Sequence, residues 1–222
     1  MKKFMLLSVL AAVAVGGAFA APEFKVSAGA GGYFASDFGG GAEASSGGET
    51  MSIKTPYFGG GGFAFLDATY VEVSLGVFGG GGTVKYEVSG ESEDSDMSVM
   101  GLDIGLLGKY PFAVSEKLSV FPLLGITYRV MLSVKDEDGD QVQNSDGDDA
   151  AGDFSALWFK FGGGLDISFT DHVYMRGEAL YGLRLANTFE KDLVDQYESP
   201  GVDTKTLLGH GLDIKIALGY RF

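Results

Sequence analysis

The last eleven residues alternate strictly between apolar and polar or small side chains, up to the carboxyl terminus. The apolar positions are Leu212, Ile214, Ile216, Leu218, Tyr220 and Phe222, and between them lie Asp213, Lys215, Ala217, Gly219 and Arg221. Because successive side chains of a strand point to opposite faces, this segment predicts a strand with one wholly apolar face. A strand that crosses a membrane as part of a barrel needs such a face toward lipid.

The same alternation predicts seven further strands, which makes eight. They span residues 24–35, 57–66, 70–77, 98–110, 118–134, 154–169 and 173–185. Long connections at 37–55, 79–97, 135–153 and 187–205 alternate with short turns at 67–69, 111–117 and 170–172. Long outer loops and short periplasmic turns are typical of outer-membrane barrels. The predicted fold is therefore all-β: an eight-stranded antiparallel up-and-down transmembrane barrel.

Three further details of this barrel can be predicted from individual strands. In the strand at 57–66 we expect Tyr57, Phe63 and Phe65 on the apolar outer face. The glycines expected on the lumen side are Gly29, Gly31, Gly60, Gly62, Gly101, Gly105, Gly162 and Gly164. They leave room for long basic side chains. Val84, Tyr86 and Val88 suggest that one strand pair continues above the membrane.

Charged residues within the predicted strands all fall on the face opposite the apolar one. They are Lys25, Glu72, Asp103, Lys109, Arg129, Lys160, Asp166, Arg176, Glu178, Arg184, Asp213, Lys215 and Arg221. A charge that faces lipid at the bilayer centre costs about 2–4 kcal/mol, which explains their exclusion from the apolar face. An eight-stranded barrel is just wide enough for side chains to fill it. We therefore expect a paired charge network that plugs the lumen, in preference to an open ion pore.

Apolar residues also occur at lumen positions. They are Leu107, Phe121, Leu123, Met131, Trp158 and Leu180. This set favours an apolar pocket within the barrel, open to small solutes.

The first twenty residues have the features of a secretory signal peptide. Lys2 and Lys3 precede an apolar run, and Ala18-Phe19-Ala20 forms a small-x-small cleavage site. We expect cleavage after Ala20, which leaves residues 21–222 as one outer-membrane β-barrel domain. Without those two lysines, 14 basic residues stand against 30 acidic ones, a net charge of −16. Such a surface repels nucleic acid.

Candidate catalytic and metal-binding residues are few. The chain has no cysteine and two histidines, His172 and His210. Asp136, Asp138 and Asp140 have the alternate spacing of a calcium loop, but Gln141 stands where the turn glycine belongs and no Glu closes the loop. We interpret this segment as solvated acidic surface, and we expect neither a metal, nor a cofactor, nor enzymatic activity.

With these features the chain resembles the small eight-stranded outer-membrane barrels, the OmpX/OmpW-like group. The most specific point is the carboxyl-terminal assembly signal of such proteins, which Lys215, Tyr220 and Phe222 match, although Ala217 replaces its glycine. The resemblance implies that the barrel-assembly machinery reads this signal and that outer-membrane lipid surrounds the folded protein. His210-Gly211-Leu212 lacks the H-x-S arrangement of those eight-stranded barrels that are lipid A deacylases.

Two functions remain open at this point. The first hypothesis is a narrow conduit for small solutes, apolar ones among them, as the resemblance to OmpW-like proteins implies. The alternative is a structural or surface-interaction barrel, with its acidic loops facing outward.

The terminal aromatic gives a first test. Replacing Phe222 by Asp, or deleting it, should leave secretion intact but lower the amount of folded barrel in isolated outer membranes. The folded fraction can be measured from the different migration of unboiled and boiled protein on a detergent gel. Asp148→Ala, in a polar loop, serves as the control. Normal assembly of both Phe222 variants would contradict the predicted signal.

Overall fold

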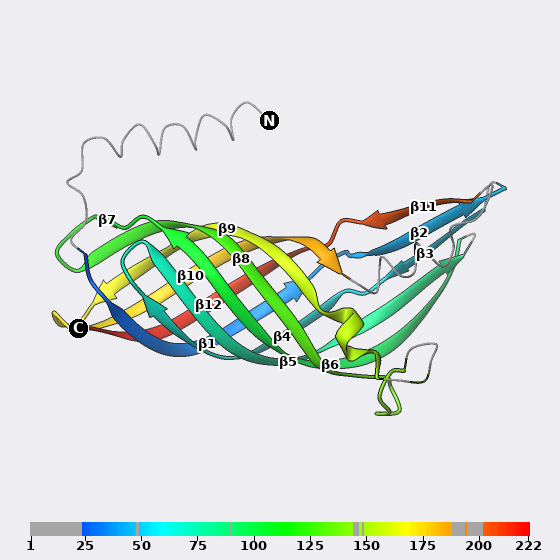
Figure 1. Ribbon diagram of the computed structural model, residues 1–222, viewed down its shortest axis with the longest axis horizontal. Helices are drawn as coiled ribbons and strands as arrows, with labels where there is room; N and C mark the ends of the chain where they lie inside the picture. Colours follow the sequence, from blue (N-terminus) through cyan, green and yellow to red (C-terminus); the bar gives the residue numbers. More distant parts are fainter. Residues whose placement is uncertain are drawn as a thin grey trace.

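The computed structural model describes residues 24–47, 49–88, 90–143, 147, 149–187, 194 and 202–222. Eight strands of one antiparallel sheet close into a barrel, because the first of them pairs with the last (Figure 1). The barrel strands are β1 (Ser27–Asp37), β4 (Tyr57–Asp67), β5 (Val71–Val88), β6 (Glu91–Lys109), β8 (Leu118–Lys135), β9 (Ala156–Ser168), β10 (Val173–Asn187) and β12 (His210–Arg221). The predicted fold class is confirmed. The predicted signal peptide lies outside the described residues.

The register of the strands fixes the tilt of the barrel. From Ser27 the paired residues run once around through Asp67, Glu72, Leu107, Gly125, Lys160, Gly182 and Gly211. They return to β1 at Asp37, so the stagger is 37 − 27, or ten residues. With a rise of about 3.3 Å per residue and a strand spacing of about 4.8 Å, this stagger tilts the strands by about 40°.

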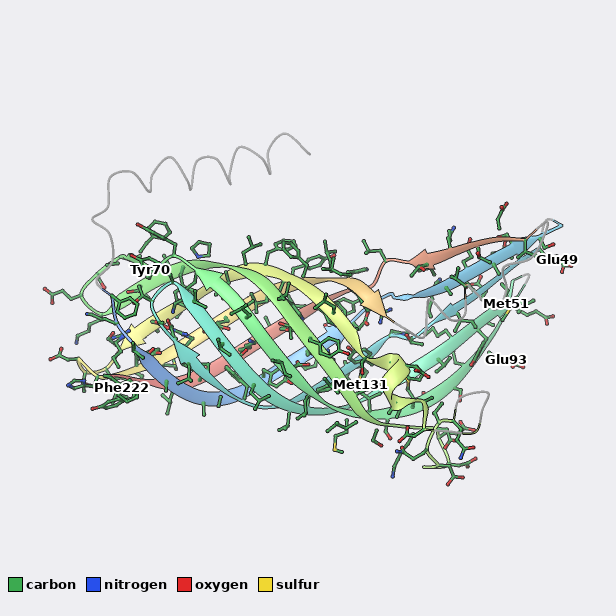
Figure 2. All side chains as sticks on the ribbon, in the orientation of Figure 1. Glu49, Met51, Tyr70, Glu93, Met131 and Phe222 are labelled. Carbon is green, nitrogen blue, oxygen red and sulfur yellow. The ribbon has the colours of Figure 1, made fainter. Side chains whose placement is uncertain are left out.

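The outer surface of the barrel is an apolar belt. Large exposed side chains on it include Val73, Leu75, Val77, Ile104, Leu106, Leu124, Ile126, Ile216 and Leu218. Figure 2 places Tyr70 and Phe222 at the end of the barrel where the chain terminates. There Tyr70 packs on Tyr110, and Phe222 on Tyr220, with ring centroids 5.9 and 5.6 Å apart. Aromatic side chains at this level are typical of the membrane–water interface.

The predicted orientation of β4, with its aromatic side chains on the outer face, is wrong. Tyr57, Phe63 and Phe65 are buried in the lumen, whereas Phe58 and Leu66 are 63% and 62% exposed on the outside. The four glycines at 59–62 have no side chains, so the alternation of apolar and polar residues is lost there. The prediction of the outer face therefore rests on the aromatic residues alone. Their rings lie over lumen cations, which gives aromatic side chains a reason to point inward. Gly60 and Gly62 are consequently outside, and Gly59 and Gly61 inside.

Beyond the barrel, the sheet continues at the end opposite the carboxyl terminus (Figure 1). Residues 37–55, expected to be a loop, form the hairpin β2 (Gly41–Ser46) and β3 (Glu49–Lys54). The acidic segment 91–96, also expected to be a connection, is the start of β6, and its pairing with β5 extends from Val71 to Val88. β11 (Asp203–Leu207) pairs with β2, and β3 with β5. We call the strands β11, β2, β3 and the outer parts of β5 and β6 the outer sheet.

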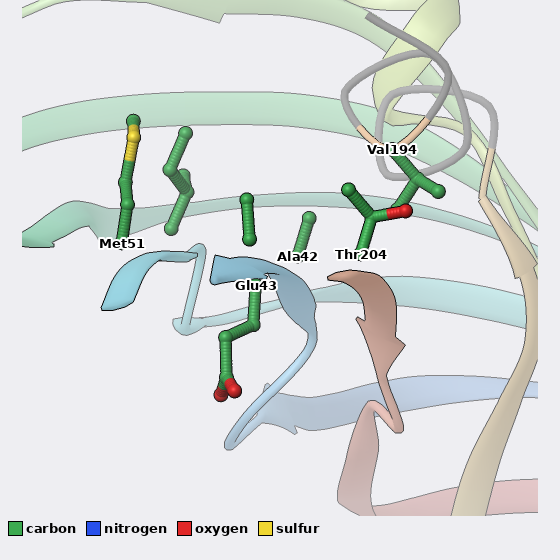
Figure 3. Close-up of a pocket in the computed structure, with 7 residues that line it drawn as sticks. Ala42, Glu43, Met51, Val194 and Thr204 are labelled. Carbon is green, nitrogen blue, oxygen red and sulfur yellow. The ribbon is translucent and has the colours of Figure 1, made fainter. Parts of the chain in front are cut away.

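Small alternating residues explain why the hairpin was missed. Ala42 and Ala44 pair with Ile53 and Met51 on one face, but the segment is rich in Gly, Ala and Ser. Gly47, at φ 61°, supplies the left-handed backbone of the turn. Figure 3 shows Ala42, Met51 and Thr204 on the side where Val194 lies, and Glu43 on the opposite side. The hairpin therefore has one apolar and one polar face.

An apolar cluster closes the outer mouth of the barrel. The 3-10 helix η2 (Ala150–Phe154) packs against β8, and Phe154 joins Met97, Val99, Met131 and Val134 in one buried group. A short strand, β7 (Phe112–Ala113), pairs with β8 at the other end. No helix among the described residues is both long and apolar enough to cross a membrane.

The facing of β4 can be tested with two neighbouring glycines. A Cβ at Gly61 would lie 1.8 Å from the Val77 carbonyl oxygen and 2.8 Å from the Phe78 Cα, whereas a Cβ at Gly62 would lie 3.7 Å from its nearest neighbour, the Gly31 carbonyl oxygen. Gly61→Ala should therefore lower the free energy of unfolding by about 1–3 kcal/mol, and Gly62→Ala should leave it unchanged. Urea unfolding in lipid vesicles measures both. Equal effects, or the reverse order, would contradict the facing seen here.

Candidate functional site

The lumen holds the charged residues and is the candidate site. The structure places eleven of the thirteen predicted charged side chains inside the barrel and Arg221 at its rim. Lys25 precedes β1 and is exposed. The sequence pattern does not predict two further lumen acids, Asp37 and Asp67, because each lies at the end of a strand, where the alternation assigns the start of a connection. Asp67 shares the face of Phe63 and Phe65, so the wrong facing of β4 also hid it.

With these two residues the charges balance. The basic residues are Lys109, Arg129, Lys160, Arg176, Arg184, Lys215 and Arg221, and the acidic ones are Asp37, Asp67, Glu72, Asp103, Asp166, Glu178 and Asp213. Seven positive and seven negative groups therefore occupy the described lumen. A desolvated charge is tolerable only beside a partner, so this equality is what a filled barrel requires.

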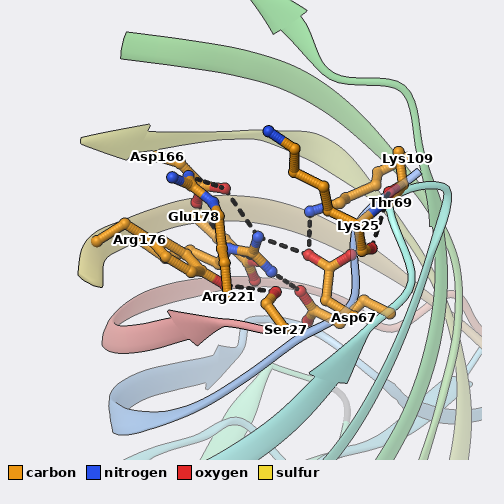
Figure 4. Close-up of polar contacts among 11 residues, drawn as sticks. Lys25, Ser27, Asp67, Thr69, Lys109, Asp166, Arg176, Glu178 and Arg221 are labelled. Atoms are coloured by element: carbon orange, nitrogen blue, oxygen red, sulfur yellow. Dashed lines mark hydrogen bonds and ion pairs between the residues drawn. The ribbon is translucent and has the colours of Figure 1, made fainter. Parts of the chain in front are cut away.

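Arg176 organises the end of the lumen near the carboxyl terminus (Figure 4). Its guanidinium donates to Asp67 and Glu72, each at 2.6 Å, and to Asp166 at 2.8 and 2.9 Å. Lys109 also donates to Asp67. The rings of Phe65 and Phe121 lie 4.6 and 5.1 Å from the Arg176 guanidinium carbon. One cation thus ties β4, β5 and β9 to β10.

Glu178 and Arg221 join this cluster more loosely. Glu178 lies 4.0 Å from Arg176 Nε and 3.7 Å from Lys215 Nζ, distances too long for direct hydrogen bonds. Arg221 donates to Ser168 Oγ at 2.7 Å and lies 3.9 Å from Asp166. Glu178 therefore interacts with its neighbours through electrostatic attraction, and Arg221 makes its contacts at the rim of the lumen.

A second cluster surrounds Arg129 toward the outer end. Arg129 Nε and Nη2 donate to the two oxygens of Asp103, each at 2.6 Å, and Nη1 donates to Tyr57 Oη at 2.7 Å. Such a bidentate pair is strong and directional. The Tyr33 hydroxyl donates to Asp103 at 3.1 Å, across the lumen from β6. Tyr33 and Tyr57 were not among the predicted site residues.

Two further pairs complete the network. Lys160 donates to Asp213 at 2.7 Å, and Arg184 donates to Asp37 at 2.7 Å. The Trp158 ring lies 4.9 Å from the Lys160 ammonium and 5.8 Å from the Arg184 guanidinium carbon. Trp158 therefore packs between cations instead of lining an apolar pocket.

The six predicted apolar lumen residues do not form one site. Leu107, Phe121, Leu123 and Leu180 make a buried cluster, while Met131 belongs to the group that closes the outer mouth. Trp158, Arg129, Arg176, Lys160 and Leu180 are each only 1% exposed. Side chains along a water-filled pore would be accessible to solvent, so the middle of this barrel is filled.

The calcium candidates Asp136, Asp138 and Asp140 lie in a turn that the Asp136 side chain stabilises. Asp136 Oδ1 accepts the backbone N–H groups of Asp138 and Asp140, at 3.1 and 2.9 Å, and Gly139 adopts φ 86° in the same turn. The described residues contain no group of three or more side chains placed to hold a metal. The Asp136 carboxylate thus closes a turn.

Neither histidine lies in the lumen. His172 Nδ1 is 2.9 Å from the carbonyl oxygen of Arg221, and the His210 ring stacks on outward-facing Tyr181, with centroids 6.0 Å apart. The three residues of the predicted assembly signal are divided between the faces: Lys215 is in the lumen, and Tyr220 and Phe222 are 47% and 75% exposed.

The central role of Arg176 can be tested by truncation. Arg176→Met would leave Asp67, Glu72 and Asp166 without their main partner and should lower the free energy of unfolding by about 3–5 kcal/mol. Lys85→Met breaks the exposed Lys85–Asp94 pair of the outer sheet, 3.6 Å apart, and should cost less than about 1 kcal/mol. Urea unfolding in vesicles compares the two. An Arg176→Met barrel as stable as the control would show that the cluster contributes little.

The chain is similar to several solved structures, and it matches one family model. Solved structures similar to the chain include OprG from Pseudomonas aeruginosa (12% identity, 91% of this chain and 97% of that chain covered, TM-score 0.47). Others are the protease OmpT from Escherichia coli (8%, 90% and 99%, 0.46) and the attachment invasion locus protein Ail of Yersinia pestis (14%, 90% and 100%, 0.41). No curated protein sequence matches the chain significantly. The family model for the outer membrane protein beta-barrel domain matches residues 5–222, so the protein belongs to this family and is a β-barrel of the outer membrane.

Proposed function

We propose that this protein is a closed, non-enzymatic outer-membrane barrel whose working part is the outer sheet at the cell surface. The observation that carries the proposal is the filled lumen, in which seven basic and seven acidic groups are paired or adjacent and the central side chains are inaccessible to solvent. A filled barrel is a rigid anchor. The polar surface that the chain offers to its surroundings then lies beyond the membrane.

The outer sheet has the chemistry of an exposed interaction element. Its polar face carries ion pairs between neighbouring strands, such as Lys205–Glu43 at 2.7 Å. Among the described residues, β11 pairs only with β2 at one edge of the sheet, and residues 91–97 of β6 pair only with β5 at the other. Four acidic residues within 91–97 keep this edge soluble. The sheet is therefore an ordered platform with accessible backbone groups.

A narrow conduit for small apolar solutes is the second candidate. It is supported by the cluster of Leu107, Phe121, Leu123 and Leu180, an apolar wall within the barrel. Passage along this wall would require movement of Phe121, whose ring lies 4.5 Å from the Lys109 ammonium. The conduit hence depends on a rearrangement, whereas the surface role does not.

Conductance separates the two candidates from a general pore. In planar bilayers the protein should give no large, steady ion current, because paired charges fill the lumen. The double variant Asp103→Ala, Arg129→Ala removes one complete pair and should raise the conductance above that of the wild type. Steady nanosiemens-scale channels from the wild type would contradict the closed barrel.

Solute uptake decides between the conduit and the surface role. Proteoliposomes that take up small apolar solutes no faster than protein-free liposomes are expected for the surface role. Faster uptake without ion current would support the conduit.

A further inference from the structure

A groove at the outer mouth of the barrel lies outside the lumen network. It has a volume of about 740 Å³, within the range of about 300–1,000 Å³ that ligand pockets occupy. One wall is the outer part of β5 and β6, and the other is the segment between β8 and η2. Its lining includes Val84, Tyr86, Met97, Val134, Val142 and Phe154. Each of these residues presents an apolar or aromatic side chain.

The groove is built by specific contacts. The Val142 N–H donates to the Val134 carbonyl oxygen at 2.9 Å, and the Ala150 N–H donates to the Val142 carbonyl oxygen at 3.0 Å. Val142 and Val84 pack against the buried cluster that closes the mouth. A molecule in the groove would rest on this cluster, above the filled lumen. Binding here does not depend on whether the barrel conducts.

The polar part of the groove is acidic. Its polar lining residues are Ser95, Asp96, Asp136, Asp140, Gln141 and Gln143, and no basic residue is among the described residues that line it. The whole segment 135–153 has eight acidic residues and one lysine. A concave site with charges of one sign attracts the opposite charge and repels its own. An anionic ligand is therefore disfavoured here.

We propose that this groove binds small amphipathic cations, molecules with an aromatic or branched apolar body and a primary ammonium group. The apolar body packs against Val84, Tyr86 and Phe154, and the ammonium group lies toward Asp136 and Asp140. Gln141 and Gln143 offer amide oxygens to its remaining N–H groups. This site is distinct from the lumen and from the polar face of the outer sheet.

Three probes that share a phenylethyl body and differ in their polar end test the charge requirement. 2-Phenylethylamine, 2-phenylethanol and 3-phenylpropionate are titrated into the protein in zwitterionic lipid nanodiscs, and empty nanodiscs correct for partitioning into lipid. The amine should bind about two- to five-fold more tightly than the alcohol, and the carboxylate more weakly than either. Asp140→Asn should reduce the preference for the amine about two-fold and leave alcohol binding unchanged. Equal binding of all three probes, or none above empty nanodiscs, would overturn the proposal.

A pair of neighbouring residues tests the location. Tyr86 lines the groove, whereas Glu87 next to it points to the opposite face of β5; both are exposed. Tyr86→Lys should abolish amine binding, and Glu87→Lys should not. Val84→Lys replaces Tyr86→Lys if the latter fails to assemble, as judged by gel migration. Amine binding unaffected by the groove variants would place the site elsewhere and overturn the assignment.

Discussion

The pairing of charges inside a narrow, lipid-surrounded barrel is the constraint on which this structure depends. Outside, lipid excludes charge, so every charged residue of a membrane strand must turn inward. Inside, eight strands leave little room for water, so each inward charge needs a partner. The equality of seven basic and seven acidic groups satisfies both demands. The ion pairs of the lumen consequently connect strands that are far apart in the sequence.

The aromatic and glycine residues serve the same constraint. Phe65, Phe78 and Phe121 lie against guanidinium or ammonium groups at 4.5–4.6 Å, which stabilises cations that have lost their water. Gly61 and Gly162 bring backbone close to backbone, and Gly182 leaves room for Trp158 and Lys160, whose side chains would lie 3.0 Å from a Cβ at that position. Charged side chains, aromatic rings and glycines thus pack together to fill the lumen.

The fold was predictable because strands that face lipid on one side alternate between apolar and polar residues. The eight strands, their closure and the inward direction of Arg129, Lys160 and Arg176 followed from that pattern alone. It failed where side chains were small or ambiguous. The four glycines of β4 concealed its facing, and the Ala and Ser residues of β2 concealed a strand that lies outside the membrane. Partners such as Arg176 with Asp67 depend on register and tilt, which alternation does not report.

The stagger of ten residues and the pairing of β1 with β12 have a consequence for how the chain folds. Ser27 and Arg221 are partners although 194 positions separate them, so the last hydrogen-bonded seam can form only after the whole polypeptide is present. Contacts between such distant segments carry a high entropic cost of closure and slow folding. Until then the edges of β1 and β12 are both open, and an open edge is unstable in lipid. The carboxyl-terminal strand therefore closes the barrel, and a chain that ends before this strand remains an open sheet.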